Sequence, residues 1–313
     1  MSKLLVIFGA TGQQGGSVVS HVLNDAELSK QYKVRGITRD PSSAAAEALK
    51  AKGVDVVKAD MTEPSSLSSA MKGAHTVFFL TSPVTGSDAK NEELVQGKGV
   101  VDVAVAEGVQ YLIFSTLPHV ARISGGKYTK VAGFDAKAEV EDYIRTLPIK
   151  SAFFSPASFM QNFQRRMALQ PTEAGTFVLA RPVSPDTELP LIDTAGDTGK
   201  YVGAILAEPE KYEGKVFCSA SAVYTMTEIA EIMSKVSGKT VKYEQIPVET
   251  FRQYIHFAGS YADDLIEMMY YQQDFGYYGP QTKELVAWAA KNARGNVHTL
   301  EEYLTENPLP SLQ

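Results

Sequence analysis

Short apolar runs alternate with amphipathic segments along the first half of the chain. The apolar runs predict buried strands at residues 4–8, 32–38, 54–57, 76–80, 111–114 and 152–154. The segments between them predict helices at residues 12–23, 44–51, 65–71, 92–106 and 136–147. Short apolar strands separated by helices are typical of right-handed βαβ units around a parallel sheet that is buried on both faces. We therefore predict an α/β fold, with a doubly wound Rossmann domain over residues 1–158.

The alternation ends near Ser158, and glycine and proline residues separate shorter elements after it. Thr225 and Glu228 form a capping box at the start of an amphipathic helix, which Gly238 ends. No long linker divides this part from the first. We predict a smaller α+β C-terminal subdomain over residues 159–313, partly interleaved with the Rossmann sheet.

The composition narrows the possible classes of function. The chain has 313 residues, of which 44% are hydrophobic and 21% charged, so its bulk is not disordered. Thirty Lys and Arg residues against 36 Asp and Glu residues leave a net charge of −6, and no basic cluster favours direct contact with nucleic acid. No apolar run approaches the roughly 18 residues of a membrane span.

The single cysteine, Cys218, excludes an intramolecular disulfide and indicates a reducing compartment such as the cytoplasm. Cys218 lies in a strand-like run and is predicted to be a small buried hydrophobic residue. The five histidines are scattered, without metal-ligand spacing and without an accompanying carboxylate cluster. We therefore predict no metal site.

A glycine-rich loop directly follows the first predicted strand and opens the first predicted helix. Its sequence is G-A-T-G-Q-Q-G-G at residues 9–16. Glycines permit a tight turn, let the backbone approach a pyrophosphate and allow close helix packing, while free N–H groups at the helix N-terminus attract the anion. The alternative is a plain strand–turn–helix whose glycines serve packing alone. We favour a dinucleotide site, whose predicted loop contacts are Gly9, Thr11, Gly12, Gln13, Gln14 and Gly15.

Thr38 and Arg39 stand at the tip of the second predicted strand, where an acidic residue would bind the adenosine ribose and indicate NAD. A guanidinium at this place can bind a 2′-phosphate, so the sequence favours NADP as the cofactor. The alternative is that Arg39 is a solvated loop residue and that Asp40 binds the ribose.

Hydroxyl side chains end the fourth and fifth predicted strands. Ligands of an open parallel sheet lie beyond the carboxyl ends of its strands, so Thr81, Ser82 and Ser115 are predicted to lie near the nicotinamide side. For each hydroxyl, the alternative is an ordinary hydrogen bond in a loop or cap.

The G-x-x-G-x-x-G spacing that begins G-A-T-G resembles the loop of the short-chain dehydrogenase/reductase superfamily, particularly its extended and atypical branches. Ordinary members carry Tyr-x-x-x-Lys on the helix after the fifth strand, with the tyrosine as general acid and the lysine on the nicotinamide ribose. Here Lys137 stands in the lysine place and Gly133 in the tyrosine place, and no tyrosine has a lysine four residues downstream. The resemblance also places Asp60, with Met61 beside it, near the adenine, although Asp60 can equally cap a helix.

Three roles are open for Lys137. It can act as the acid, as in the isoflavone-reductase-like branch; it can bind the nicotinamide ribose; or it can form a surface pair with Glu141, four residues on. We favour ribose binding. The histidine after the fifth strand, His119, could face a substrate cleft, but a loop role is the simpler interpretation.

Several longer segments carry a closer resemblance. The sequences GATGQQGGSV at 9–18, VRGITRDP at 34–41, GFDAKAEVEDY at 133–143, PASFMQNF at 156–163 and LPLIDTAGDTG at 189–199 are similar to the NmrA-like family. The resemblance covers most of the chain and is closest to the NADPH-sensor type, which binds NADP in a Rossmann fold, lacks the catalytic tyrosine and regulates partner proteins. It implies that Pro156, Phe159 and Asn162 lie on the cofactor side.

Two functions follow. The resemblance and the missing acid favour an NADP(H)-binding redox sensor or regulator, with a transcription factor or signalling protein as partner and access to the nucleus as well as the cytoplasm. The alternative is an atypical NADPH-dependent reductase of a quinone, an enone or a similar small molecule, supported by the retained Lys137 and the hydroxyls at the strand ends. A homodimer is compatible with either.

Overall fold

The central sheet of the protein is parallel throughout. The computed structural model describes residues 2–82, 84, 86, 88–164, 169–172, 175–309 and 312. Within these ranges, seven parallel strands lie in the order β11-β6-β5-β4-β1-β2-β3. They are β1 (Lys3–Phe8), β2 (Tyr32–Thr38), β3 (Asp55–Lys58), β4 (Thr76–Phe79), β5 (Tyr111–Ser115), β6 (Lys150–Pro156) and β11 (Val216–Ser219). The order 3-2-1-4-5-6 of the first six strands is the Rossmann order, which confirms the predicted fold class.

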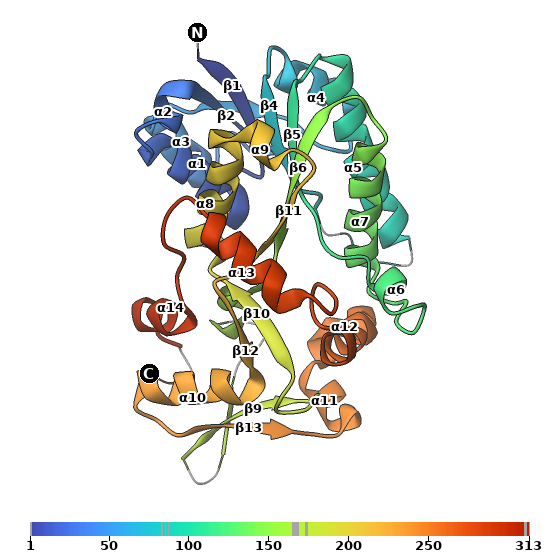
Figure 1. Cartoon of the computed structure of the whole chain (residues 1–313), viewed down its shortest axis with the longest axis vertical. Helices are drawn as coiled ribbons and strands as arrows, with labels where there is room; N and C mark the ends of the chain where they lie inside the picture. Colours follow the sequence, from blue (N-terminus) through green and yellow to red (C-terminus); the bar gives the residue numbers. More distant parts are fainter. Residues whose placement is uncertain are drawn as a thin grey trace.

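Helices cover both faces of this sheet (Figure 1). On one face, α1 (Gln13–Asn24) packs against α8 (Thr194–Ala207), and their apolar residues join the larger hydrophobic cluster. On the other face, α4 (Pro64–Met71), α5 (Ala89–Ala106) and α7 (Ala132–Arg145) enclose a second cluster. The short helices α2 (Leu28–Gln31), α3 (Ala44–Ala51), α6 (Val120–Ile123) and α9 (Pro209–Tyr212) complete this lobe.

The small lobe contains two further sheets and several helices. One sheet has the order β12-β10-β7 and the other β13-β9-β8 among the described residues. Their strands are β7 (Ser158–Phe159), β8 (Gln170–Pro171), β9 (Phe177–Arg181), β10 (Glu188–Ile192), β12 (Ala222–Thr225) and β13 (Val241–Gln245). The helices are α10 (Met226–Ser237), α11 (Val248–Tyr254), α12 (Ala262–Phe275) and α14 (Leu300–Glu306), with 3-10 segments η1 (Met160–Gln164) and η2 (His256–Tyr261). Helix α13 (Thr282–Asn292) packs mainly on β11 of the large sheet and also contacts α8 and β12.

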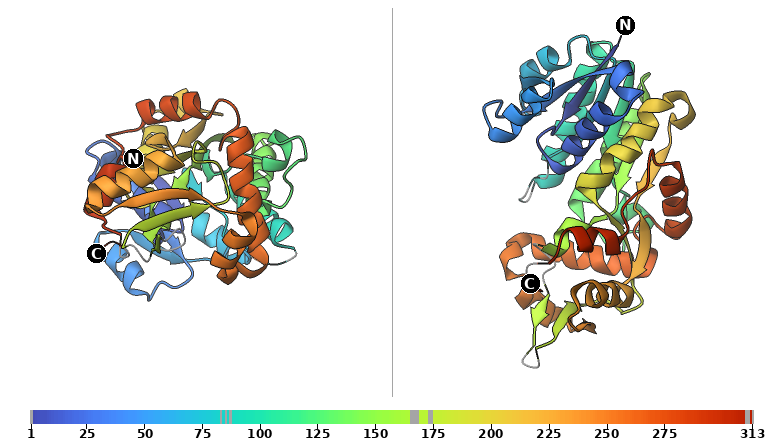
Figure 2. Two further views of the ribbon diagram at one scale, coloured as in Figure 1. Left: turned by 90° about the horizontal axis from the view of Figure 1, so that it is seen from below. Right: turned by 90° about the vertical axis from the view of Figure 1, so that its left-hand side faces the viewer.

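The chain passes between the two lobes more than once. After β10 it returns to the large lobe as α8, and β11 then pairs with β6 at the edge of the large sheet. Figure 2 shows the small lobe beyond the carboxyl ends of the large sheet's strands. Cys218 of β11 is buried, as predicted, and burial raises the pKa of its thiol to about 12. None of the described helices is long and apolar enough to cross a membrane.

Helix α1 approaches the end of β1 so closely that Gly15 has no room for a side chain. A Cβ on Gly15 would lie 2.8 Å from the carbonyl oxygen of Phe8 and would collide with the carbonyl oxygen of Gly9. Both obstacles are backbone atoms, which cannot rotate aside. By contrast, a Cβ on Gly16 would lie 3.4 Å from the carbonyl oxygen of Ala10, an ordinary contact.

Replacing Gly15 with alanine should therefore lower the free energy of unfolding by about 1–3 kcal/mol, the usual cost of overpacking. Gly16→Ala is the matched control, and it should be neutral or stabilise by up to about 1 kcal/mol because alanine favours the helix. Urea denaturation followed by circular dichroism measures both variants. Equal stability of the two variants would contradict the close approach at Gly15.

Candidate functional site

The glycine-rich loop lies at the carboxyl end of β1 and leads directly into α1. Gly9 has a φ of +64°, a conformation that glycine adopts without strain, and the amide of Gly12 donates a hydrogen bond to the Gly9 carbonyl at 2.8 Å. Gly12 is the N-cap residue of α1, and no side chain caps this helix end. The first amides of α1 are thus left for an anion, so the loop fits a pyrophosphate group.

Neighbouring strand ends bring further predicted site residues to the same edge of the sheet. Ser115, the buried last residue of β5, donates a hydrogen bond to Gln14 Oε1 at 2.8 Å and ties the loop to that strand. Thr81 and Ser82 follow β4; Thr81 is buried, whereas Ser82 is exposed and its amide donates to Gln96 Oε1 at 3.3 Å. Thr11 lies in the loop itself, and Gln13 is the first residue of α1.

Asp40, after the end of β2, is engaged by its own turn. Its Oδ1 accepts hydrogen bonds from Ser42 Oγ at 2.5 Å and from the Ser42 amide at 2.9 Å, which lowers the pKa of Asp40. The Asp40 amide donates to Thr38 Oγ1 at 3.2 Å. Arg39 between them is exposed. The carboxylate that would compete for the ribose is therefore already hydrogen-bonded within its own turn.

Asp60, after β3, lies in a similar turn. Its Oδ1 accepts hydrogen bonds from the Thr62 amide at 2.9 Å and from Thr62 Oγ1 at 2.8 Å. These bonds, and more weakly the charge of Arg39, lower the pKa of Asp60. Met61 is half-buried and packs against the hydrophobic cluster under α4 and α5. Arg39 and Asp60 thus lie near each other at the predicted adenosine end.

A buried carboxylate that sequence reasoning missed holds Lys137. Glu93 of α5 is 2% exposed, and its Oε1 accepts hydrogen bonds from Lys137 Nζ and from Thr81 Oγ1, the latter at 2.5 Å. The alternative of a surface pair between Lys137 and Glu141 is wrong, because Lys137 binds Glu93 and Glu141 binds Arg145. An ammonium has three donors, so the pair with Glu93 leaves Lys137 able to bind a ribose hydroxyl as well.

Gly133, in the tyrosine place of α7, faces the same carboxylate. A Cβ on Gly133 would lie 3.7 Å from Glu93 Oε2, which is an ordinary contact. Among the described residues beyond its own chain segment, no other atom lies within 4 Å of this position. The site therefore has no phenol at this place, and a carboxylate oxygen lies beside it.

Pro156, Phe159 and Asn162 follow the end of β6 and pass into the small lobe. Pro156 ends β6 and is buried, Phe159 lies in β7 and Asn162 in η1, both half-buried. The hydroxyl of Tyr277 donates to the Pro156 carbonyl at 3.2 Å, and that of Tyr278 donates to the preceding carbonyl at 2.7 Å. These two tyrosines are buried and thus pack into the core beside the end of β6.

His119 lies in the loop before α6, in agreement with the simpler interpretation, and two carboxylates hold it there. It caps the N-terminus of α6, and its Nδ1 lies 3.0 Å from Oδ1 of the buried Asp135. Its Nε2 lies 3.6 Å from Glu139 Oε1. These contacts give His119 a structural role at the start of α6.

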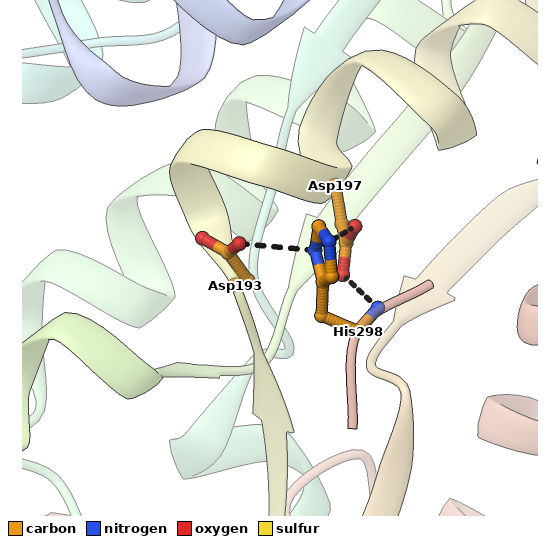
Figure 3. Close-up of side chains that lie close together, drawn as sticks. All are labelled: Asp193, Asp197 and His298. Atoms are coloured by element: carbon orange, nitrogen blue, oxygen red, sulfur yellow. Dashed lines mark hydrogen bonds and ion pairs between the residues drawn. The ribbon is translucent and has the colours of Figure 1, made fainter. Parts of the chain in front are cut away.

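A second histidine, His298, lies between Asp193 and Asp197 (Figure 3). Its Nδ1 is 3.1 Å from Asp193 Oδ2 and 3.0 Å from Asp197 Oδ1, and its amide donates to Asp197 Oδ2 at 2.8 Å. Burial raises the pKa of Asp197, and Lys200 Nζ lies 2.8 Å from its Oδ1. The expectation that no carboxylate cluster accompanies the histidines is wrong here. With Lys200 as its cation, the cluster ties α8 to the segment before α14.

Comparisons with known proteins agree with this architecture. Residues 1–304 match the model of the NmrA-like family. An NmrA-like family domain-containing protein of Dictyostelium discoideum is 34% identical over 81% of this chain and 84% of its own. The NmrA-like family domain-containing oxidoreductase FrzB of Cladobotryum sp. is 30% identical over 91% of this chain and 88% of its own.

Solved structures share the fold. NmrA, a negative transcriptional regulator solved in complex with NAD and with NADP, gives TM-scores of 0.80 and 0.79 at 22% and 23% identity, over 98% of this chain and 95% of each solved chain. The triphenylmethane reductase of Citrobacter sp., complexed with NADP(H), gives a TM-score of 0.75 at 22% identity, over 98% of this chain and 99% of its own.

The pairing of Lys137 with Glu93 predicts a large effect on stability. Lys137→Met should lower the free energy of unfolding by about 3–5 kcal/mol, because it leaves a buried carboxylate without its cation. The double variant Lys137→Met/Glu93→Gln removes both charges and should recover most of this loss. Urea denaturation measures all the variants, with Glu93→Gln alone to complete the cycle. Simple addition of the two single effects would contradict the coupling.

Proposed function

The chain belongs to the NmrA-like family, and we propose that it is an NADP(H)-dependent oxidoreductase acting on a small conjugated hydride acceptor. The relative FrzB, which aligns over nearly the whole chain, is named an oxidoreductase. From the sequence alone, the missing acid favoured a regulator over a reductase. The name of this relative supports the reductase instead.

The cofactor would be bound along the carboxyl edge of the sheet. The amides at the start of α1 would hold the pyrophosphate, because the N-cap residue Gly12 has no side chain and no other side chain caps this helix end. Arg39 would bind the 2′-phosphate, and Lys137 would bind the nicotinamide ribose. When bound, the reduced nicotinamide supplies a hydride. Ser115 supports this arrangement by fixing the Gln14 side chain against β5.

The residues at the tyrosine place limit which acceptors can be reduced. Gly133 offers no proton donor, and the ammonium of Lys137 is ion-paired with Glu93. Reduction of a simple ketone needs a proton on oxygen as the hydride arrives. A quinone or an enone delocalises the negative charge and can take its proton from water afterwards, and a conjugated cation is neutralised by the hydride itself. These acceptors suit a site without a phenol, and the similar Citrobacter sp. protein is named a triphenylmethane reductase.

A redox sensor that regulates a partner protein is the second candidate. The absence of a side chain at Gly133 favours it, because a protein that only binds the cofactor needs no acid. Its fold neighbour NmrA is named a negative transcriptional regulator. In this case the partner, a transcription factor or signalling protein, would respond to the cofactor's redox state.

Arg39→Ala should weaken NADP binding by about 10- to 100-fold, because a charge-assisted hydrogen bond contributes roughly 1.5–3 kcal/mol. NAD lacks the 2′-phosphate and serves as the internal control, whose affinity should not change. Calorimetric titration of both cofactors against both proteins measures the effect. Equal affinity of the unaltered protein for NAD and NADP would overturn the assignment of Arg39.

The unaltered protein should oxidise NADPH with 1,4-naphthoquinone or a triarylmethane dye cation as acceptor, and not with cyclohexanone. Loss of NADPH absorbance measures turnover. Gly12→Val is the control, because a branched side chain would fill the pyrophosphate cradle and abolish both cofactor binding and turnover. If the protein binds NADPH but reduces none of these acceptors, the result would favour the redox sensor over the oxidoreductase.

A further inference from the structure

Glu93 uses only one of its two carboxylate oxygens to hold its neighbours. Both of its hydrogen bonds with the described residues end on Oε1, from Lys137 Nζ and from Thr81 Oγ1. Lys137 comes from α7 and Thr81 from the end of β4, so the carboxylate of α5 is fixed from two sides. Its orientation is therefore set before any ligand arrives.

The other oxygen, Oε2, faces the place where Gly133 lacks a side chain. It lies 3.7 Å from the position of a Cβ on Gly133, and no other atom of the described residues outside that chain segment comes within 4 Å of this position. Ordinary members of the superfamily place a phenol there, which donates a hydrogen bond. In this chain a carboxylate oxygen lies beside the space at Gly133, so this place offers a hydrogen-bond acceptor instead of a donor.

We infer that Glu93 is a specificity-determining residue whose Oε2 accepts a hydrogen bond from a hydroxyl or amino group of the hydride acceptor. The inference rests on the proposed oxidoreductase function and narrows its substrate class to conjugated acceptors that carry such a donor. A carboxylate is a strong acceptor in a buried setting, because little water competes for it. Gly133 supplies the room in which the donor group reaches it.

An acceptor without the donor would leave Oε2 buried without a partner. Sites built to bind a substrate O–H or N–H discriminate strongly against analogues that lack it, since the desolvated protein group is then unpaired. We expect a preference of roughly 5- to 100-fold for the donor-bearing acceptor, the range that one such hydrogen bond provides.

Two quinones that differ only in the donor test this inference: 2-hydroxymethyl-1,4-naphthoquinone and its methoxymethyl ether. Their dissociation constants are measured by calorimetry on the protein saturated with NADP+ and on the protein alone, and their kcat/KM with NADPH is compared. The unaltered protein should prefer the hydroxymethyl compound in binding and in kcat/KM. Glu93→Gln should remove most of this preference, because an amide can bind either quinone.

Gly133→Ala tests the same geometry without changing a charge. The added methyl group makes only an ordinary contact with Oε2, but it occupies the space that the donor group of the quinone needs. The preference for the hydroxymethyl quinone should therefore fall in this variant too. Gly99→Ala, on α5 where a Cβ meets nothing within 4 Å, is the matched control and should keep the preference. If Glu93 served folding alone, Glu93→Gln would lower the affinity and the kcat/KM for both quinones by the same factor.

Equal use of the two quinones by the unaltered protein, or a preference that survives in both Glu93→Gln and Gly133→Ala, would overturn the inference. In that case turnover of either quinone would leave the proposed oxidoreductase function standing. Failure of every acceptor in the presence of bound NADPH would overturn the function itself, and failure of both quinones to bind would overturn the inference.

Discussion

Helix α1 is held between β1 and α8 by close backbone approaches on both of its sides. On the sheet side, Gly15 leaves no room for a side chain. On the other side, Cβ atoms on Gly199 and Gly203 of α8 would collide with the Ser17 carbonyl and the His21 ring, and the Gly199 amide donates to Ser17 Oγ at 2.9 Å. The place of the phosphate loop depends on this packing, because the loop ends where α1 begins.

The same packing connects the two lobes. Helix α8 follows β10 of the small lobe, so its fit against α1 anchors that lobe to the large sheet. The cluster of Asp193, Asp197 and His298 then ties the start of α8 to the segment before α14. Tyr277 and Tyr278 make a second connection through carbonyl groups at the end of β6. The edge of the sheet that carries the candidate site is thereby placed against the small lobe.

The chemistry of the site follows from what replaces the usual acid. Removal of the phenol at position 133 takes away a proton donor, and the buried pair of Lys137 and Glu93 stands in its neighbourhood. Burying an ion pair costs desolvation free energy, and removing one partner of a buried pair costs more, because the other charge is then left without a partner. Such a site suits acceptors that need no proton at the moment of hydride transfer, or a protein that binds the cofactor without turnover.

The sequence by itself determined the local elements and predicted the edge of the sheet at which the candidate site lies. Apolar runs located six of the seven described strands of the Rossmann sheet, but not β11 as its seventh strand. The capping box of Thr225 and Glu228 with Gly238, whose φ is +69°, marked both ends of α10 correctly. These features are local, since they depend on neighbours within a few residues. Which residues of the strand ends touch a cofactor remains a prediction.

Only the tertiary structure decided the long-range pairs. Glu93 reaches Lys137 across 44 residues of sequence, and His298 reaches Asp197 across about a hundred. No spacing rule relates residues on different helices, because their meeting depends on how α5 packs on α7 and how the chain returns after β10. The sequence could show that a tyrosine was missing at position 133, but the carboxylate beside that position became visible only when the helices were packed together.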